Sequence, residues 1–554
     1  MAYSIGIDFG TESGRVLLLN LESGEEVTTT VELYESGVID HQIPYTGEKL
    51  PTDWALQDPM DYVRVIEKGI PQVLKQSGIN PDEVIGLGVD FTSCTVIPVN
   101  KEGIPLCALN EWKTHPHAWP KLWKHHAAQV YANHINEQAE LRHENFISRY
   151  GGRVSSEWYY PKLLEIFNDD REIYEAMYAF VEATDWIVWY LTGNLKRNSC
   201  TAGYKALWSD EEGFPSTEFF LSIHDEFTQP FEKIGDQFYS LGTKAGFLQE
   251  NIAIKLGISL QTAVAVGNVD AHVSVPGAGV SEEGTLVMVM GTSICHLTVN
   301  QKEVRLPGIT GVVNNGVLPG FFGYEAGQAA VGDMFAWFVE HAVPSAYEEA
   351  AKIHHQTIYE LMESLASKLN SGESGLVAID WWNGNRSIIG DANLSGVIIG
   401  YTLKSKPEEI YRALLESTAF GTRKIVENFE NHNIPIQKLV ACGGLSFKSS
   451  LLMQIYADVC GIPVYVMGST EIPARGAALF GAVAAGGGRG GFNSIQEAAV
   501  KLAPPLYNIY HPNLQNHSVY DQLYRIYNQL YEYFGVSEVG LIHEIKNIRM
   551  RNLH

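Results

Sequence analysis

One stretch near the start of the chain decides the fold: Ile5-Gly6-Ile7-Asp8-Phe9-Gly10-Thr11-Glu12-Ser13-Gly14-Arg15-Val16-Leu17-Leu18-Leu19. Two apolar runs of strand length are joined by a short polar turn, which is typical of a β-hairpin. The plan returns in Leu286-Val287-Met288-Val289-Met290-Gly291-Thr292-Ser293-Ile294-Cys295-His296-Leu297. Two hairpins of one design predict a duplicated α/β architecture.

The division between the two copies is expected near residue 280. The chain has 554 residues, enough for two large domains. Pro276-Gly277-Ala278-Gly279, followed by Ser281-Glu282-Glu283-Gly284, has the composition of a hinge. We therefore predict an N-terminal domain over residues 1–280 and a C-terminal domain over 281–554 that ends in a helical tail.

Charge and hydropathy exclude several classes of partner. The formal net charge of −25 gives no electrostatic support for binding a phosphate backbone, so nucleic acid is not expected as a partner. No window approaches the 18 or so consecutive apolar residues of a membrane span. Asp8 interrupts the first apolar segment, so the N-terminus does not resemble a secretory signal. We expect a cytoplasmic protein without membrane association.

Two aspartates stand where chemistry is expected. Asp8 ends a strand and is followed by Gly10 and Thr11, an arrangement that suits phosphate oxygens and a hydrated Mg²⁺, although an ordinary tight turn would look the same. Asp270 follows the apolar run 263–266 and could take a proton from a hydroxyl group, or it could simply cap the next helix. Both alternatives stay open on these residues alone.

Six motifs resemble those of the FGGY carbohydrate kinases, a branch of the superfamily that includes actin and hexokinase. They are Ile5 to Thr11, Gly267 to Asp270, Gly291 to Ser293, Glu416 to Gly421, Gly443 to Ser446 and Glu471 to Ala478, in family order. The resemblance implies two actin/hexokinase-like (ribonuclease H-like) α/β domains with a cleft between them. It also implies ATP and Mg²⁺ as cofactors and a sugar as the second substrate.

Within the family, the resemblance is greatest to the branch that phosphorylates L-ribulose in arabinose breakdown. Trp112-Lys113-Thr114-His115 stands where many relatives carry an Asp-x-Arg sugar motif, and the stretches 202–208 and 323–328 also fit this branch. A kinase for another ketopentose or pentitol (D-ribulose, ribitol or xylulose) is the alternative. A non-catalytic actin-like nucleotide clamp is a second one, but it would not need Asp270 or Glu325. A homodimer is the candidate assembly.

The resemblance also assigns roles to individual residues. It implies Asp270 as the catalytic base, Asp8 as a Mg²⁺ contact through water, and Lys205 and Glu325 as sugar contacts, although each of these two charges could instead lie on the surface. Ser93 and Cys94 fit a wall of the sugar pocket or a plain turn. The residues expected to contact ATP are Gly10, Thr11, Gly291, Thr292, Ser293, Gly443, Gly444, Ser446 and Ala474. The small residues among them could equally serve helix packing.

Overall fold

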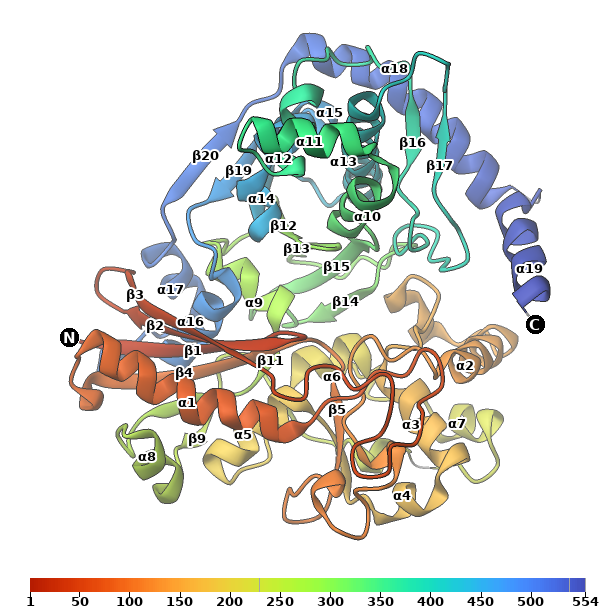
Figure 1. The fold of residues 1–554 in the computed structure, drawn as a ribbon. Helices are drawn as coiled ribbons and strands as arrows, with labels where there is room; N and C mark the ends of the chain where they lie inside the picture. The colour runs from red at the N-terminus through yellow and green to blue at the C-terminus, as the bar shows by residue number, and fades with distance from the viewer. Residues whose placement is uncertain (229, 538, 554) are drawn as a thin grey trace.

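The computed structural model describes residues 1–228, 230–537 and 539–553. A seven-stranded sheet lies in each half of the molecule (Figure 1). The first has the order β3-β2-β1-β4-β10-β9, with β11 beside β4. Its strands are β1 (Tyr3–Phe9), β2 (Ser13–Asn20), β3 (Glu26–Leu33), β4 (Val84–Phe91), β9 (Lys244–Phe247), β10 (Ala263–Ala265) and β11 (Asn268–Val269).

The second sheet repeats the plan of the first. Its order is β14-β15-β13-β12-β18-β19-β20. In each sheet a hairpin strand pair is antiparallel and the next two strands are parallel to its first strand. The predicted duplicated α/β fold is confirmed. The strands are β12 (Thr285–Met290), β13 (Ile294–Asn300), β14 (Gly311–Asn314), β15 (Phe322–Gln328), β18 (Lys438–Cys442), β19 (Val464–Met467) and β20 (Leu506–Tyr510).

The alternation of side chains in β1 explains how the first sheet is covered. Ile5 and Ile7 are fully buried in a cluster with α1 (Pro59–Ser77) and α5 (Ala183–Thr192). On the opposite face Gly6 leaves room for α16 (Ile472–Ala485), because a Cβ there would lie 1.7 Å from the Ala474 carbonyl oxygen. Large residues on one face and small ones on the other thus place different helices on the two faces.

Helix α16 comes from the C-terminal part of the sequence but packs against the first sheet. In Figure 1 this blue helix lies beside the red strand β1 and the orange strand β4. It also crosses α9 (Asp270–Gly277) closely, since a Cβ on Gly476 would lie 2.0 Å from the Val273 carbonyl oxygen. The division at residue 280 stays a prediction; α16 belongs in space with the first sheet.

The remaining helices form one inserted lobe and one cap. The lobe lies between β4 and β9 and contains α2 (Gln129–Leu141), α3 (Tyr159–Asp169), α4 (Arg171–Ala176), α6 (Ser199–Lys205) and α7 (Thr217–Ile223), with strands β5 (Val96–Val99), β6 (Ala179–Glu182), β7 (Arg197–Asn198) and β8 (Phe238–Tyr239). Helix α8 (Glu250–Leu256), between β9 and β10, packs beside α1 against the first sheet. The cap surrounds the second sheet with α10 (Gly332–Ala342), α11 (Ser345–Ile353), α12 (Ile358–Ala366), α13 (Pro407–Asn431), α14 (Gly444–Lys448) and α15 (Ser450–Cys460), and with strands β16 (Val377–Ile379) and β17 (Val397–Ile399).

The C-terminal tail is mainly helical and includes one strand. It contains α17 (Ile495–Lys501), α18 (Leu514–Tyr531), a π-helical turn (Glu532–Val536) and α19 (Leu541–Leu553). Between α17 and α18, however, β20 adds an antiparallel edge strand to β19. Among the helices that the structure describes, none is both long and apolar enough to cross a membrane.

Candidate active site

Each hairpin turn is closed by the same kind of backbone hydrogen bond. The Gly10 N–H donates to the Ser13 carbonyl at 2.9 Å, and the Gly291 N–H donates to the Ser293 carbonyl at 2.9 Å. The first turn is further fixed at Thr11, whose carbonyl accepts from Gln57 at 2.7 Å. Gly291 and Thr292 are exposed. The two turns occupy equivalent positions in the two sheets, as a clamp on a polyphosphate requires.

Three carboxylates meet at the carboxyl ends of neighbouring strands of the first sheet. Asp8 in β1 is in register with Asp90 in β4, and β11, paired with β4, leads directly to Asp270. Burial and the charge of Asp8 raise the pKa of Asp270 to about 7. Burial, then the charges of Asp8 and Asp270, raise the pKa of Asp90 well above its ordinary value. Burial and mutual repulsion therefore make these carboxyl groups hold their protons more tightly than ordinary aspartates do.

Asp90 was missed by the sequence reasoning although a signal existed. Like Asp8, it ends an apolar strand, but its closeness to Asp8 follows only from the strand order. Both its carboxylate oxygens are buried and without a hydrogen-bond partner in the described protein. Asp270 is different, since its Oδ1 accepts from the Ala271 N–H at 2.6 Å; it is the first residue of α9, whose N-cap is Val269, so Asp270 is not the helix cap.

Lys205 and Glu325 are not surface charges. They come from α6 and β15, one from each half, and are 5% and 7% exposed. The Lys205 Nζ lies 3.2 Å from both Glu325 carboxylate oxygens, and His272 Nε2 lies 3.2 Å from Oε2. Burial would raise the pKa of Glu325, but Lys205 and His272 hold it below its ordinary value. The two residues expected to share a sugar are thus paired directly with each other.

Ser93 and Cys94 lie in the loop between β4 and β5. Ser93 is half-buried, whereas Cys94 is buried with a positive φ of 59°. The Lys162 ammonium, itself fully buried, donates to the Cys94 carbonyl at 2.7 Å and to the Leu122 carbonyl at 2.8 Å. The loop is therefore held by its backbone, and the roles of Ser93 and Cys94 in the sugar pocket stay predictions.

The residues predicted to border adenosine fall into two groups. Gly443 and Gly444 begin α14, and a Cβ on Gly444 would meet nothing within 4 Å, so this turn has open space beside it. Ser446 is buried and donates its hydroxyl to the Gly443 carbonyl at 2.8 Å, which holds the turn. Ala474 is fully buried against Gly6 of β1. The Ala474 carbonyl oxygen is the atom that faces Gly6, and the assignment of Ala474 to ATP stays a prediction.

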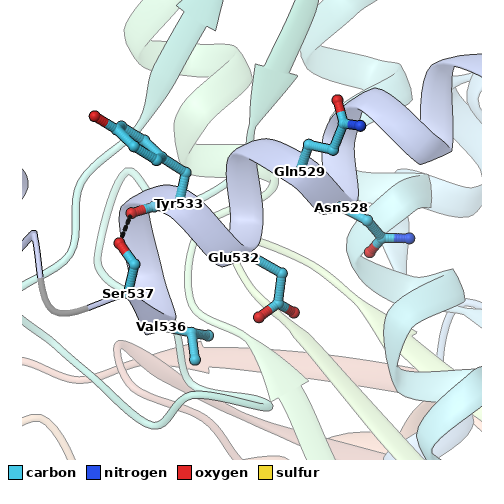
Figure 2. A pocket seen from close by; sticks show the side chains of 6 residues that line it. All are labelled: Asn528, Gln529, Glu532, Tyr533, Val536 and Ser537. Carbon is cyan, nitrogen blue, oxygen red and sulfur yellow. Dashed lines mark hydrogen bonds between the residues drawn. The ribbon is translucent and has the colours of Figure 1, made fainter.

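A separate hollow lies on the C-terminal helices. Its volume is about 560 Å³. Figure 2 shows the side chains that line it: Asn528, Gln529, Glu532, Tyr533, Val536 and Ser537. It contains none of the predicted site residues. We therefore place the candidate active site between the two sheets and not in this hollow.

Sequence comparison places both halves in one family. The N-terminal domain of the FGGY family of carbohydrate kinases matches residues 3–277, and its C-terminal domain matches residues 286–485. The chain belongs to the FGGY family. It is thereby an ATP-dependent sugar kinase, as the sequence motifs indicated. The predicted fold class is confirmed as well.

Curated relatives match this FGGY chain over nearly its whole length. The ribulokinase of Anoxybacillus flavithermus is 50% identical over 546 residues, covering 98% of this chain and 97% of the relative. The ribulokinase of Mycolicibacterium smegmatis is 44% identical over 535 residues, covering 96% and 94%.

Solved structures of other family members share the fold. The xylulose kinase from Rhodospirillum rubrum has a TM-score of 0.79 at 20% identity and covers 96% of this chain and 98% of its own. The gluconate kinase from Lactobacillus acidophilus has a TM-score of 0.78 at 17% identity, covering 97% and 99%. Because these sequence identities are low, the structural similarity is evidence for a shared fold only.

Proposed function

We propose that the protein transfers the terminal phosphoryl group of ATP to L-ribulose and forms L-ribulose 5-phosphate. The observation that carries the proposal is the buried Lys205–Glu325 pair, which joins the two halves beside Asp270. A buried ammonium and carboxylate offer donors and an acceptor to sugar hydroxyls. Full-length relatives named ribulokinase support L-ribulose as the sugar.

Asp270 is assigned as the base that orients the sugar hydroxyl and takes its proton. The hydroxyl oxygen forms a bond to the terminal phosphorus, the bond from that phosphorus to the bridging oxygen breaks, and ADP leaves. A pKa raised to about 7 by burial makes the carboxylate a better proton acceptor than an ordinary aspartate. Positioning remains the larger part of this catalysis.

The hairpins and the acidic edge are assigned to MgATP. We assign Gly10, Thr11 and the Gly291–Ser293 turn to the phosphates, and Gly443 and Gly444 to adenosine. The unpartnered oxygens of Asp90, next to Asp8, fit a hydrated Mg²⁺, which usually keeps several waters. When bound, the ion would neutralise phosphate charge. Among the described residues no three His, Cys, Asp or Glu side chains are arranged to hold a metal directly, so Asp8, Asp90 and Asp270 would hold the ion through water and the phosphates.

Sugar binding and closure of the two halves are coupled in this proposal. Because Lys205 and Glu325 come from different halves, a sugar that contacts both favours the closed state. In that state water is kept from the phosphoryl group. Solution scattering tests the coupling: sugar plus a nonhydrolysable ATP analogue should compact the wild type, and compact Lys205→Ala or Glu325→Ala less.

A coupled ATP-consumption assay tests the substrate. It compares L-ribulose with D-ribulose, xylulose, ribitol, gluconate and glycerol at matched concentrations. The proposal expects the highest kcat/KM with L-ribulose. A higher value with another ketopentose or a pentitol would keep the kinase and replace the substrate.

A further inference from the structure

Arg386 lies over the strand that carries Glu325. It belongs to a loop closed by two backbone hydrogen bonds between Asn385 and Asp391, at 2.9 and 2.8 Å. Its Cδ and one terminal nitrogen lie 3.1 and 3.5 Å from where a Cβ on Gly327 would stand. The glycine thus leaves room for the arginine side chain on β15.

Strand register brings Arg386 between the two parts of the active site. Gly327 and Glu325 are two positions apart, so they share one face of β15. Gly327 pairs with Cys295 of β13, which is only two residues, about 7 Å, beyond Ser293 of the second hairpin. The arginine therefore stands between the expected phosphate turn and the expected sugar contact.

The charges around Arg386 leave it available to an anion. In the part of the chain that the structure describes, no carboxylate oxygen lies within 4.0 Å of its guanidinium nitrogens, whereas Lys205 is paired with Glu325 and Arg15 lies 3.6 Å from Asp8. Burial would lower its pKa, but the negative charges of Glu157 and Glu325 raise it, so it stays a cation. A polyphosphate that approaches three clustered aspartates needs such a charge.

We propose that Arg386 binds the phosphoryl group while it passes from ATP to the sugar, an inference that rests on the proposed kinase function. Its planar fork of N–H donors suits phosphoryl oxygens. The guanidinium neutralises charge on the phosphoryl group while the proton goes to Asp270 and ADP leaves. The arginine keeps its own proton and bonds throughout.

Two variants of Arg386 test the role. Arg386→Gln should lower kcat by about 10²- to 10³-fold, the usual loss for one donor to developing charge. Its Kd for L-ribulose, measured by calorimetry without nucleotide, should stay within about threefold of the wild type, a change worth less than about 1 kcal/mol. Added guanidinium at a non-denaturing concentration should restore part of kcat. The kcat of Arg386→Lys should lie between those of Arg386→Gln and the wild type, because lysine keeps the positive charge but lacks the planar set of N–H donors.

Arg153→Gln is the matched control. Arg153 is exposed and donates to the Gly390 carbonyl of the same loop at 3.3 Å, so its loss should leave kcat unchanged. The inference is wrong if Arg386→Gln keeps kcat within threefold. It is also overturned if the sugar Kd rises as much as kcat/KM falls and guanidinium rescues nothing.

Binding of ADP with aluminium fluoride separates this inference from the substrate assignment. The complex imitates the transferring phosphoryl group and can be titrated whether or not the wild type turns over L-ribulose. Weaker binding by Arg386→Gln than by the wild type supports the role of Arg386, even if L-ribulose proves to be the wrong sugar. Equal binding by both would refute it.

Discussion

Replacing Glu325 by glutamine should destabilise the protein more than the loss of a surface ion pair would. Both carboxylate oxygens lie 3.2 Å from the Lys205 ammonium, and the substitution leaves that ammonium buried without its carboxylate. Removing one partner of a buried pair costs about 3–5 kcal/mol. At about 2–4 °C per kcal/mol, the thermal midpoint should fall by roughly 6–20 °C.

Scanning calorimetry of a double-mutant cycle checks this value. Lys205→Met and Glu325→Gln should each be destabilising, and the double variant should be less destabilised than their sum by about 1 kcal/mol or more. The exposed pair of Arg171 and Glu175, 3.2 Å apart, is the matched control, where Glu175→Gln should cost no more than about 0.5 kcal/mol. Additive effects of the two buried substitutions would refute the reasoning.

The same pair should control catalysis. Lys205→Ala and Glu325→Ala should each leave a sugar hydroxyl without a hydrogen-bond partner, which costs about 1–3 kcal/mol of binding free energy. Their kcat/KM for L-ribulose should fall roughly 5- to 150-fold, and discrimination among ketopentoses should shrink. Variants that keep wild-type specificity would show that the sugar lies elsewhere.

Other substitutions probe the rest of the structure. Asp270→Asn should lower kcat by about 10²-fold or more while calorimetry still detects sugar binding, and near-normal turnover would exclude Asp270 as the base. Asp8→Ala should raise the KM for MgATP more than the Kd for sugar; the opposite pattern would contradict the hairpin assignment. His296 is buried, and burial lowers its pKa to about 3, so the folded state stays neutral while the unfolded chain takes a proton below pH of about 6.5. As the pH is lowered from about 6.5 to about 3, the free energy of unfolding should therefore decrease by up to about 1.4 kcal/mol per pH unit. Urea titrations of His296→Gln should show a smaller decrease over this range. An equal decrease in the wild type and the variant would mean that the histidine is charged in the folded state. Gly6→Ala should lower the thermal midpoint sharply, whereas Gly488→Ala, with nothing within 4 Å, should not; equal midpoints would contradict the packing of α16.

Local patterns predicted the parts of the molecule that are built locally. The hairpins around Gly10 and Gly291 were readable because apolar runs and a polar turn adjoin in sequence. The position of Asp270 after its strand was predicted on the same grounds. These features need no knowledge of distant residues.

What sequence could not supply depends on long-range packing. Asp90 can be recognised as a site residue only from its register with Asp8 across two parallel strands. Arg386 carries no local signal and is brought to Gly327 by the path of a loop. The contact of Ala474 with Gly6 could not be foreseen either, because a small residue at a helix start fits a ligand or a facing strand equally well.

The place of α16 determines when the first sheet can be completed during synthesis. Strand β4 ends at Phe91, but the helix that covers the glycine face of β1 and β4 begins at Ile472. At ~5–20 residues per second, about 380 further residues take roughly 20–80 s to emerge from the ribosome. During that interval the nascent chain exposes an unfinished sheet face around Gly6, Gly86 and Gly88. A chain released before residue 485 would lack the complete helix and would keep that face exposed. Chaperones and proteases recognise such an exposed face.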